Sequence, residues 1–196
     1  MFFWIIKLLA FIPFWLIYPT KIKKLGKIPK GKVVFVANHR SNLDPLIMLN
    51  MFWREQHVVA KKELYKNKLL AAFLKGMKTI PVDRSKVELT TIKQCLSVLK
   101  KNKTLTIFPE GTRNKTDKPL VEIKEGAGLI AIKGDAPIVP IWIKKKPKPF
   151  CLNTIYVGDA IHLKKEDLQH SNEIIKNELL SLREKTLKKN KQSNNK

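Results

Sequence analysis

Short apolar runs alternate with longer amphipathic segments along most of the chain. Runs rich in β-branched and aromatic residues predict strands at 33–37, 58–60, 79–82, 105–108 and 138–143, with a later strand at 153–162. Apolar residues at helical spacing predict helices at 46–53, 63–74, 87–101 and 124–133, and a basic amphipathic helix at 172–188. This alternation predicts an α/β domain with a largely parallel sheet flanked by helices.

The first twenty residues are apolar almost throughout, which favours contact with a membrane. As a helix they would be about 30 Å long, close to the thickness of a hydrocarbon core. Lys7 and Pro13 interrupt the run, so we expect a helix that lies in one leaflet rather than one that crosses the bilayer. The alternative is a helix that packs into the core of the domain. We therefore expect a membrane-associating segment (1–30), a folded domain (31–188) and a disordered basic tail (189–196).

Composition adds a large positive charge to this picture. The 196 residues suit one domain, and 39 Lys and Arg against 16 Asp and Glu give a net charge of +23. Anionic lipid, an acidic protein or nucleic acid would each suit this charge, and lysines spread over solvated surface are the bland alternative. Aromatic residues are not interleaved with the basic tail, so we expect no nucleic-acid partner. Lysines directly after the apolar segment favour anionic headgroups on the cytoplasmic side of a cell membrane; they are Lys21, Lys23, Lys24, Lys27, Lys30 and Lys32.

The two cysteines, Cys95 and Cys151, are too few for a disulfide framework. No CxxC pair or histidine cluster with zinc spacing occurs, so we expect no metal site. A reducing compartment is therefore expected, and each cysteine is expected to be a small residue of the core.

Candidate chemistry lies in three polar motifs that each follow an expected strand. Residues 38–45 (NHRSNLDP) follow the first strand, Asp83 and Arg84 follow another, and residues 109–113 (PEGTR) follow a third. Reactive groups in open α/β sheets lie on loops beyond the carboxyl ends of strands. We therefore expect these motifs to share one edge of the sheet.

His39 and Asp44 form a candidate base and orienting acid. On one straight helix they would point about 140° apart and could not meet. Ser41 and Asn42 are turn formers, and Asp44 followed by proline suits a helix N-cap, so we expect the chain to bend between them. A neutral imidazole could then accept a proton from a substrate hydroxyl while the carboxylate holds the other ring nitrogen.

The blander alternative is that Asp44 only caps a helix and His39 is a polar residue at a strand end. The spacing alone is weak, because His162 and Asp167 repeat it. The second copy has no preceding asparagine and no Asp-Pro helix start, and it lies in a lysine-rich stretch, so we do not expect it to be catalytic.

Arg84 and Arg113 are candidates for binding phosphate at two points. Gly111 permits a positive φ angle, and Glu110 could accept a hydrogen bond from a substrate hydroxyl or orient Arg113. The alternatives are an ion pair between Arg84 and Asp83, and an ordinary turn at Glu110 and Gly111.

Taken in order, these motifs resemble the glycerolipid acyltransferases, specifically the bacterial 1-acylglycerol-3-phosphate acyltransferases. The resemblance covers residues 33–143 and includes two further blocks, at 61–84 and at 138–141 (IVPI). It implies an α/β acyltransferase domain with N-terminal membrane attachment, His39 as general base and Asp44 as its orienting partner. It also implies a set of substrate-binding residues around the acceptor phosphate: Arg84, Glu110, Gly111, Thr112 and Arg113.

The function implied by this resemblance is transfer of a fatty acyl group to the 2-hydroxyl of 1-acylglycerol-3-phosphate, forming phosphatidic acid. The acyl donor would be acyl carrier protein or coenzyme A thioester, a co-substrate, and no cofactor is expected. Two alternatives remain open at this point. One is an acyltransferase of the same family that acts on another lysolipid, and the other is a non-catalytic basic protein that binds membranes.

Overall fold

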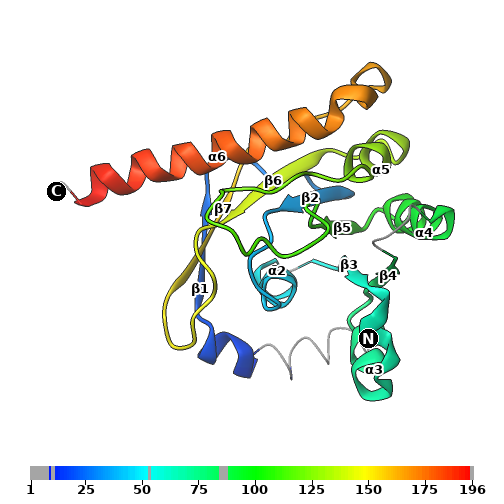
Figure 1. Cartoon of the computed structure of the whole chain (residues 1–196), viewed down its shortest axis with the longest axis horizontal. Helices are drawn as coiled ribbons and strands as arrows, with labels where there is room; N and C mark the ends of the chain where they lie inside the picture. Colours follow the sequence, from blue (N-terminus) through cyan, green and yellow to red (C-terminus); the bar gives the residue numbers. More distant parts are fainter. Residues whose placement is uncertain (1–8, 10–11, 53, 84–87, 195–196) are drawn as a thin grey trace.

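The computed structural model describes Leu9 and residues 12–52, 54–83 and 88–194, and its centre is a seven-stranded sheet (Figure 1). The strand order is β1-β7-β6-β2-β5-β3-β4, and every neighbouring pair is parallel except β6 and β7. The largely parallel α/β fold expected from the sequence is confirmed. The strands are β1 (Thr20–Lys24), β2 (Val33–Ala37), β3 (Gln56–Lys61), β4 (Ile80–Val82), β5 (Thr104–Ile107), β6 (Ile138–Ile143) and β7 (Asn153–Val157).

Helices cover both faces of this sheet. One face packs against α4, α5 and α6, and the other packs against α2 and the C-terminal half of α3. The helices are α2 (Asp44–Met51), α3 (Lys68–Gly76), α4 (Leu89–Lys100), α5 (Ala127–Lys133) and α6 (Ser171–Asn194), with short 3-10 helices η1 (Lys62–Lys66) and η2 (Lys165–His170).

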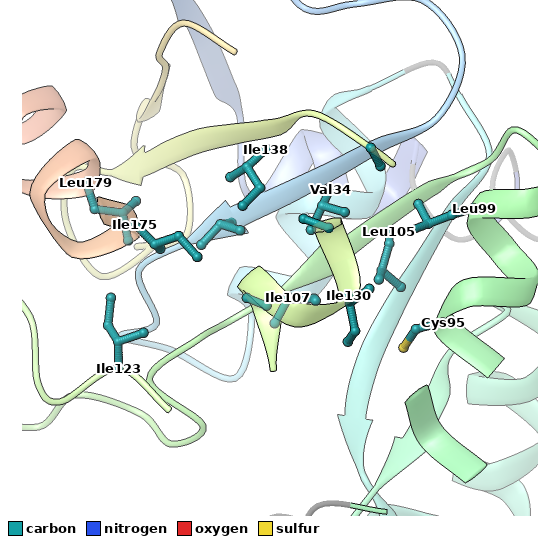
Figure 2. Close-up of a cluster of buried hydrophobic side chains, with 14 of the residues drawn as sticks. Val34, Cys95, Leu99, Leu105, Ile107, Ile123, Ile130, Ile138, Ile175 and Leu179 are labelled. Carbon is teal, nitrogen blue, oxygen red and sulfur yellow. The ribbon is translucent and has the colours of Figure 1, made fainter. Parts of the chain in front are cut away.

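The central strand β2 shows why both faces are apolar. All five of its residues are buried, and they alternate between the two cores, so that Val34 and Val36 face one and Phe35 faces the other. A strand with helices on both sides has no polar face, and the continuous apolar run in the sequence reflects this. Figure 2 shows the core on the side of α4, α5 and α6, with Val34, Leu105 and Ile138 of the sheet near Leu99, Ile130 and Leu179 of the helices.

Strand β1 is an element that the sequence analysis does not predict. It pairs with β7 at the edge of the sheet, so the folded domain begins inside the stretch 1–30 that the sequence assigns to the membrane-associating segment. Lysines flank Ile22 on both sides, and Ile22 alone in this strand packs against a core. A polar edge strand is held mainly by its main-chain hydrogen bonds, so its hydrophobic signal is weak.

Three further elements differ from their expected bounds. The helix expected at 63–74 is divided into η1 and α3, because the extended Asn67 caps α3 by accepting the Leu70 N–H at 3.0 Å. The strand expected at 153–162 ends at Val157, and Ile161 forms a separate bridge with Ile138. Helix α6 continues to Asn194, through most of the tail expected to be disordered, because lysine and glutamine are good helix formers and no Gly or Pro interrupts them.

Half of the N-terminal apolar segment, residues 1–8, 10 and 11, lies outside the described residues. Residues 12–17 form a helical turn, and Ile12, Trp15 and Leu16 are exposed on it. Among the helices that the structure describes, none has the length and apolarity needed to cross a bilayer.

Candidate active site

The pairing of β2 with β5 positions the first and third motifs opposite each other. Val36 pairs with Ile107, and because the two strands are parallel, the loops that follow them start at the same end of the sheet. His39 and Glu110 each lie three residues beyond that pair. The His39 backbone N–H donates to Glu110 Oε1 at 2.7 Å, which joins the two loops.

The predicted meeting of His39 and Asp44 is confirmed. Asp44 Oδ2 lies 3.0 Å from His39 Nδ1, and the two residues are 5% and 0% exposed. Between them the chain turns, with the Asp44 N–H donating to the Ser41 carbonyl at 3.2 Å. The helix that follows begins at Asp44 itself, with Leu43 at the N-cap, so Asp44 is the first helical residue rather than the cap that the sequence predicts.

The Asp44 carboxylate faces back toward the loop instead of capping α2. Its Oδ2 accepts the backbone N–H groups of Arg40 at 2.6 Å and Ser41 at 2.7 Å, besides the imidazole. An ionised carboxylate only accepts, so this contact favours the tautomer that carries its proton on Nδ1 of His39. The Nε2 lone pair is then available to accept a proton from a substrate.

Phe108 and Asn114 hold His39 from the second loop. The Phe108 ring lies 4.4 Å from the imidazole between ring centroids, at 31° to it. The Asn114 backbone N–H donates to the His39 carbonyl at 2.7 Å. On the first loop, the Asn38 side chain bonds to the backbone of Ile143 at the end of β6, with its Oδ1 accepting the N–H at 2.7 Å. The backbone around His39 is therefore tied to the ends of β5 and β6, and the Phe108 ring packs against the imidazole.

Glu110 is 1% exposed, and both of its carboxylate oxygens accept backbone N–H groups. Oε1 accepts from His39, and Oε2 accepts from Val121 at 3.0 Å. Burial raises the pKa of Glu110, and these two hydrogen bonds partly oppose the rise. Its observed partners are therefore backbone groups of the protein, rather than Arg113, which the sequence offered as one partner.

Gly111 adopts the positive φ that the sequence analysis allows for it, at 60°. A Cβ at this position would lie 2.8 Å from Cδ of Lys124, so the turn also needs the space. Thr112 and Arg113 follow on the exposed side of the turn, and Asn114 then returns to His39. Arg84 lies outside the described residues, so its expected place beside the phosphate stays a prediction.

An apolar pocket of about 300 Å³ adjoins this turn. It extends between β4, β5, α4 and α5, and one of its lining residues is Phe108, whose ring contacts the His39 ring. Charged groups are found among its lining residues, and they are Asp83, Glu88, Lys124 and Glu125. Its apolar lining consists of Val59, Val82, Ile92, Cys95, Ile107, Phe108, Pro109, Ala127 and Ile130.

Sequence reasoning identified the histidine and its acid but missed the residues that hold them. Asn38 is the first residue of one motif, and Phe108 and Asn114 flank another, but the sequence analysis gives none of them a role. Val121 carries no signal at all, because only its backbone is used. In the described part of the chain, no three His, Cys, Asp or Glu side chains are grouped so as to hold a metal ion.

The fold is shared with a solved acyltransferase. The crystal structure of the 1-acyl-sn-glycerophosphate (LPA) acyltransferase PlsC from Thermotoga maritima matches with a TM-score of 0.62, over 90% of this chain and 76% of that one. The sequence identity is 24%, and the match establishes the common fold.

The Acyltransferase family model matches residues 19–144, and the chain belongs to this family. The 1-acyl-sn-glycerol-3-phosphate acyltransferase of Bacillus subtilis is 45% identical over 84 residues, which are 43% of this chain and 41% of that protein. The protein of the same name from Helicobacter pylori is 32% identical over 138 residues, which are 67% of this chain and 56% of that protein. The chain thus aligns with about half the length, or less, of these curated relatives.

Proposed function

We propose that this protein transfers a fatty acyl group from a thioester to the 2-hydroxyl of 1-acylglycerol-3-phosphate, which gives phosphatidic acid. The observation that carries the proposal is the buried His39–Asp44 pair beside an exposed basic turn and an apolar pocket. Membership of the Acyltransferase family and relatives named for this reaction support it.

His39 is the proposed general base. Its Nε2 takes the proton of the acceptor hydroxyl as that oxygen attacks the thioester carbonyl carbon. The tetrahedral intermediate then collapses, the C–S bond breaks, and the imidazolium returns the proton to the leaving thiolate. Asp44 holds the tautomer and stabilises the imidazolium, because its carboxylate bonds to Nδ1 at 3.0 Å.

Arg113 and Arg84 are the proposed partners of the acceptor phosphate. Arg113 is exposed on the turn whose next residue, Asn114, binds the His39 carbonyl, so its charge is placed near the catalytic loop. A guanidinium binds phosphate oxygens at two points and would orient the acceptor hydroxyl toward the base. Glu110, Gly111 and Thr112 then serve by shaping the turn that carries Arg113.

The apolar pocket is the proposed place of the donor's acyl chain. Phe108 both lines this pocket and contacts the His39 ring, so a chain there would end near His39. Acyl carrier protein and coenzyme A are both anionic, and the net charge of +23 suits either donor. The reaction is proposed to occur at the cytoplasmic face of the cell membrane, where the lipid acceptor resides.

An assay of the purified chain in mixed detergent and phospholipid micelles tests this function. A panel of lysophospholipids is crossed with acyl carrier protein and coenzyme A thioesters, and products are separated by mass. Phosphatidic acid is the expected main product, formed from 1-acylglycerol-3-phosphate. A preference for a different lysolipid would move the chain to another activity within the family. Release of free fatty acid without transfer to any acceptor would contradict the proposal.

A further inference from the structure

The connection between β6 and β7 presents the most exposed aromatic side chain among the described residues. This loop, residues 144–152 (KKKPKPFCL), contains four lysines and no acidic residue. Phe150 is 79% exposed and Leu152 is 68% exposed. Large apolar side chains beside clustered cations indicate a surface that meets both hydrocarbon and negative charge.

The loop is held in one conformation by Asn153, the first residue of β7. The Asn153 Oδ1 accepts the Lys148 N–H at 3.1 Å, and its Nδ2 donates to the Cys151 carbonyl at 3.0 Å. Phe150 has a φ of 54°, which is unfavourable for a bulky residue. The fold therefore maintains a strained backbone while leaving the ring in solvent, so internal packing does not explain the ring's position.

The same loop is joined to the N-terminal helical turn. The Phe150 N–H donates to the Ile17 carbonyl at 2.6 Å, and the Asn153 N–H donates to the Pro19 carbonyl at 2.8 Å. Figure 1 shows the helical turn 12–17, in blue, beside the loop between β6 and β7. Exposed Trp15 and Leu16 of that turn thus lie on a segment directly bonded to the loop that carries Phe150 and Leu152.

The loop 144–152 and the N-terminal helical turn lie at the same end of the sheet as the loop that carries His39, namely at the carboxyl end of β2. Ile143, the residue before the loop, exchanges hydrogen bonds with Asn38, the residue before His39. On the other side, Thr20 at the start of β1 pairs with Asn153 at the start of β7. The loop, the N-terminal turn and His39 therefore all lie at one end of the strands.

We propose that residues 144–152 form a second bilayer contact, in which Phe150 and Leu152 enter an anionic phospholipid surface beside the N-terminal segment. Lys144, Lys145, Lys146 and Lys148 then lie among the phosphate headgroups. Two bilayer contacts at the same end of the sheet fix the orientation of the domain on the membrane. A single helix would leave the domain free to rotate about it. Given the proposed function, this orientation turns His39 toward the lipid acceptor.

Cys151 provides a native probe of this contact, because it lies between Phe150 and Leu152 in the sequence and is exposed. The expectation that both cysteines are core residues is therefore wrong for Cys151. Cys95 is buried, and burial raises the pKa of its thiol to about 12, so it reacts little. The full chain is treated with a charged maleimide, with and without phosphatidylcholine vesicles that contain about one quarter phosphatidylglycerol. We expect the vesicles to slow modification of Cys151 by about tenfold or more, because a thiol that lies in the bilayer interface is shielded from a charged reagent in the water.

Variants distinguish the loop from the N-terminal segment. Phe150→Asn keeps a residue that tolerates positive φ, and combined with Leu152→Gln it should weaken vesicle binding by about tenfold or more. Lys145→Gln with Lys146→Gln should weaken binding to anionic vesicles by about fivefold per lysine and leave binding to neutral vesicles unchanged. Leu168→Gln, which alters an exposed leucine of η2, is the matched control and should bind like the parent.

The proposal is overturned if Cys151 reacts equally fast on vesicle-bound and free protein, or if the loop variants bind like the parent. Either result would mean that the N-terminal segment binds alone. The acyl-transfer assay in micelles is read separately. Protection of Cys151 without acyl transfer would remove the proposed function and leave the bilayer contact standing, and the reverse result would do the opposite.

Discussion

The same histidine–aspartate spacing occurs at two places in this molecule and forms two different structures. At residues 39–44, the Asp44 carboxylate reaches the imidazole at 3.0 Å, and both side chains are buried. At residues 162–167, the Asp167 carboxylate accepts the Lys164 N–H at 2.8 Å, and His162 is exposed. The difference lies in what precedes and encloses each pair.

The residues that surround each histidine decide whether the histidine and the aspartate meet. His39 follows a central strand and is held by Glu110, Phe108 and Asn114 from the neighbouring strand's loop. His162 follows an isolated bridge near the start of η2, where Asp167 serves the local turn. A buried histidine–aspartate contact of this kind thus depends on two adjacent strand ends, whereas the spacing alone depends on one short segment of the chain.

The largest contrast between the two regions should come from the histidines. His39→Ala should lower kcat for acyl transfer by about 10²–10⁴-fold, because the substrate hydroxyl loses its general base. His162→Ala should leave kcat unchanged. Steady-state rates in micelles measure both, and circular dichroism with thermal melting checks that each variant folds. Wild-type turnover in His39→Ala would falsify the assignment of the base.

The aspartates sharpen the same comparison with a second readout. Asp44→Asn should lower kcat by about 10²–10⁴-fold, since an amide no longer fixes the tautomer or stabilises the imidazolium. It should also lower stability, because hydrogen bonds to a charged acceptor contribute about 1.5–3 kcal/mol each. Asp167→Asn should change stability by about 0.5 kcal/mol or less and leave activity unchanged, because an amide oxygen can still accept the Lys164 N–H. If Asp44→Asn changed the melting temperature while kcat stayed at the parent value, Asp44 would be a structural residue only.

The sequence was sufficient to predict the features of this site that depend on neighbouring residues in the chain. The apolar run of β2 and the turn formers Ser41 and Asn42 carry the bend that joins His39 to Asp44. Glu110 shows the limit, because its partners depend on the β2–β5 register and on the return of the chain at Val121. β1 shows another limit, since a lysine-rich edge strand has little hydrophobic pattern to read.

Substitution of Arg113 tests whether the exposed turn beside the His39–Asp44 pair binds the acceptor phosphate. Arg113→Ala should raise the KM for 1-acylglycerol-3-phosphate by about 10-fold or more, because charge-assisted hydrogen bonds contribute about 1.5–3 kcal/mol. Lys115→Ala, which removes an exposed cation two residues further on, is the matched control and should have little effect. A rise confined to the KM of the thioester donor would assign Arg113 to the donor instead.

A third histidine–carboxylate pair, Glu55 and His57, lies near the start of β3, at the opposite end of the sheet from His39. Glu55 Oε1 lies 3.3 Å from His57 Nε2, and the same carboxylate bonds to Lys78 at 2.7 Å and Lys103 at 3.3 Å. Burial alone would raise the pKa of Glu55, but the hydrogen bonds from these three side chains outweigh it and lower the pKa to about 2. This pair is therefore expected to stabilise the fold and to leave catalysis untouched.

Glu55→Gln should give the smallest effect on activity and a pH-dependent effect on stability. A carboxyl with a depressed folded pKa stabilises the protein above its unfolded pKa, and this contribution is lost as the pH falls from about 4.5 toward about 2. Near pH 7 the variant should melt about 2–4 °C below the parent, for a network contribution of about 1 kcal/mol. The gap should shrink at about pH 3, because Glu55 of the unfolded parent is protonated there while Glu55 of the folded parent is still largely ionised. Burial lowers the pKa of His57, so His57→Gln is melted alongside to separate its own titration, and Glu122→Gln serves as the control for an exposed carboxylate. A melting gap that stayed constant across this range would mean that packing of the side chain, rather than its charge, carries the stabilisation.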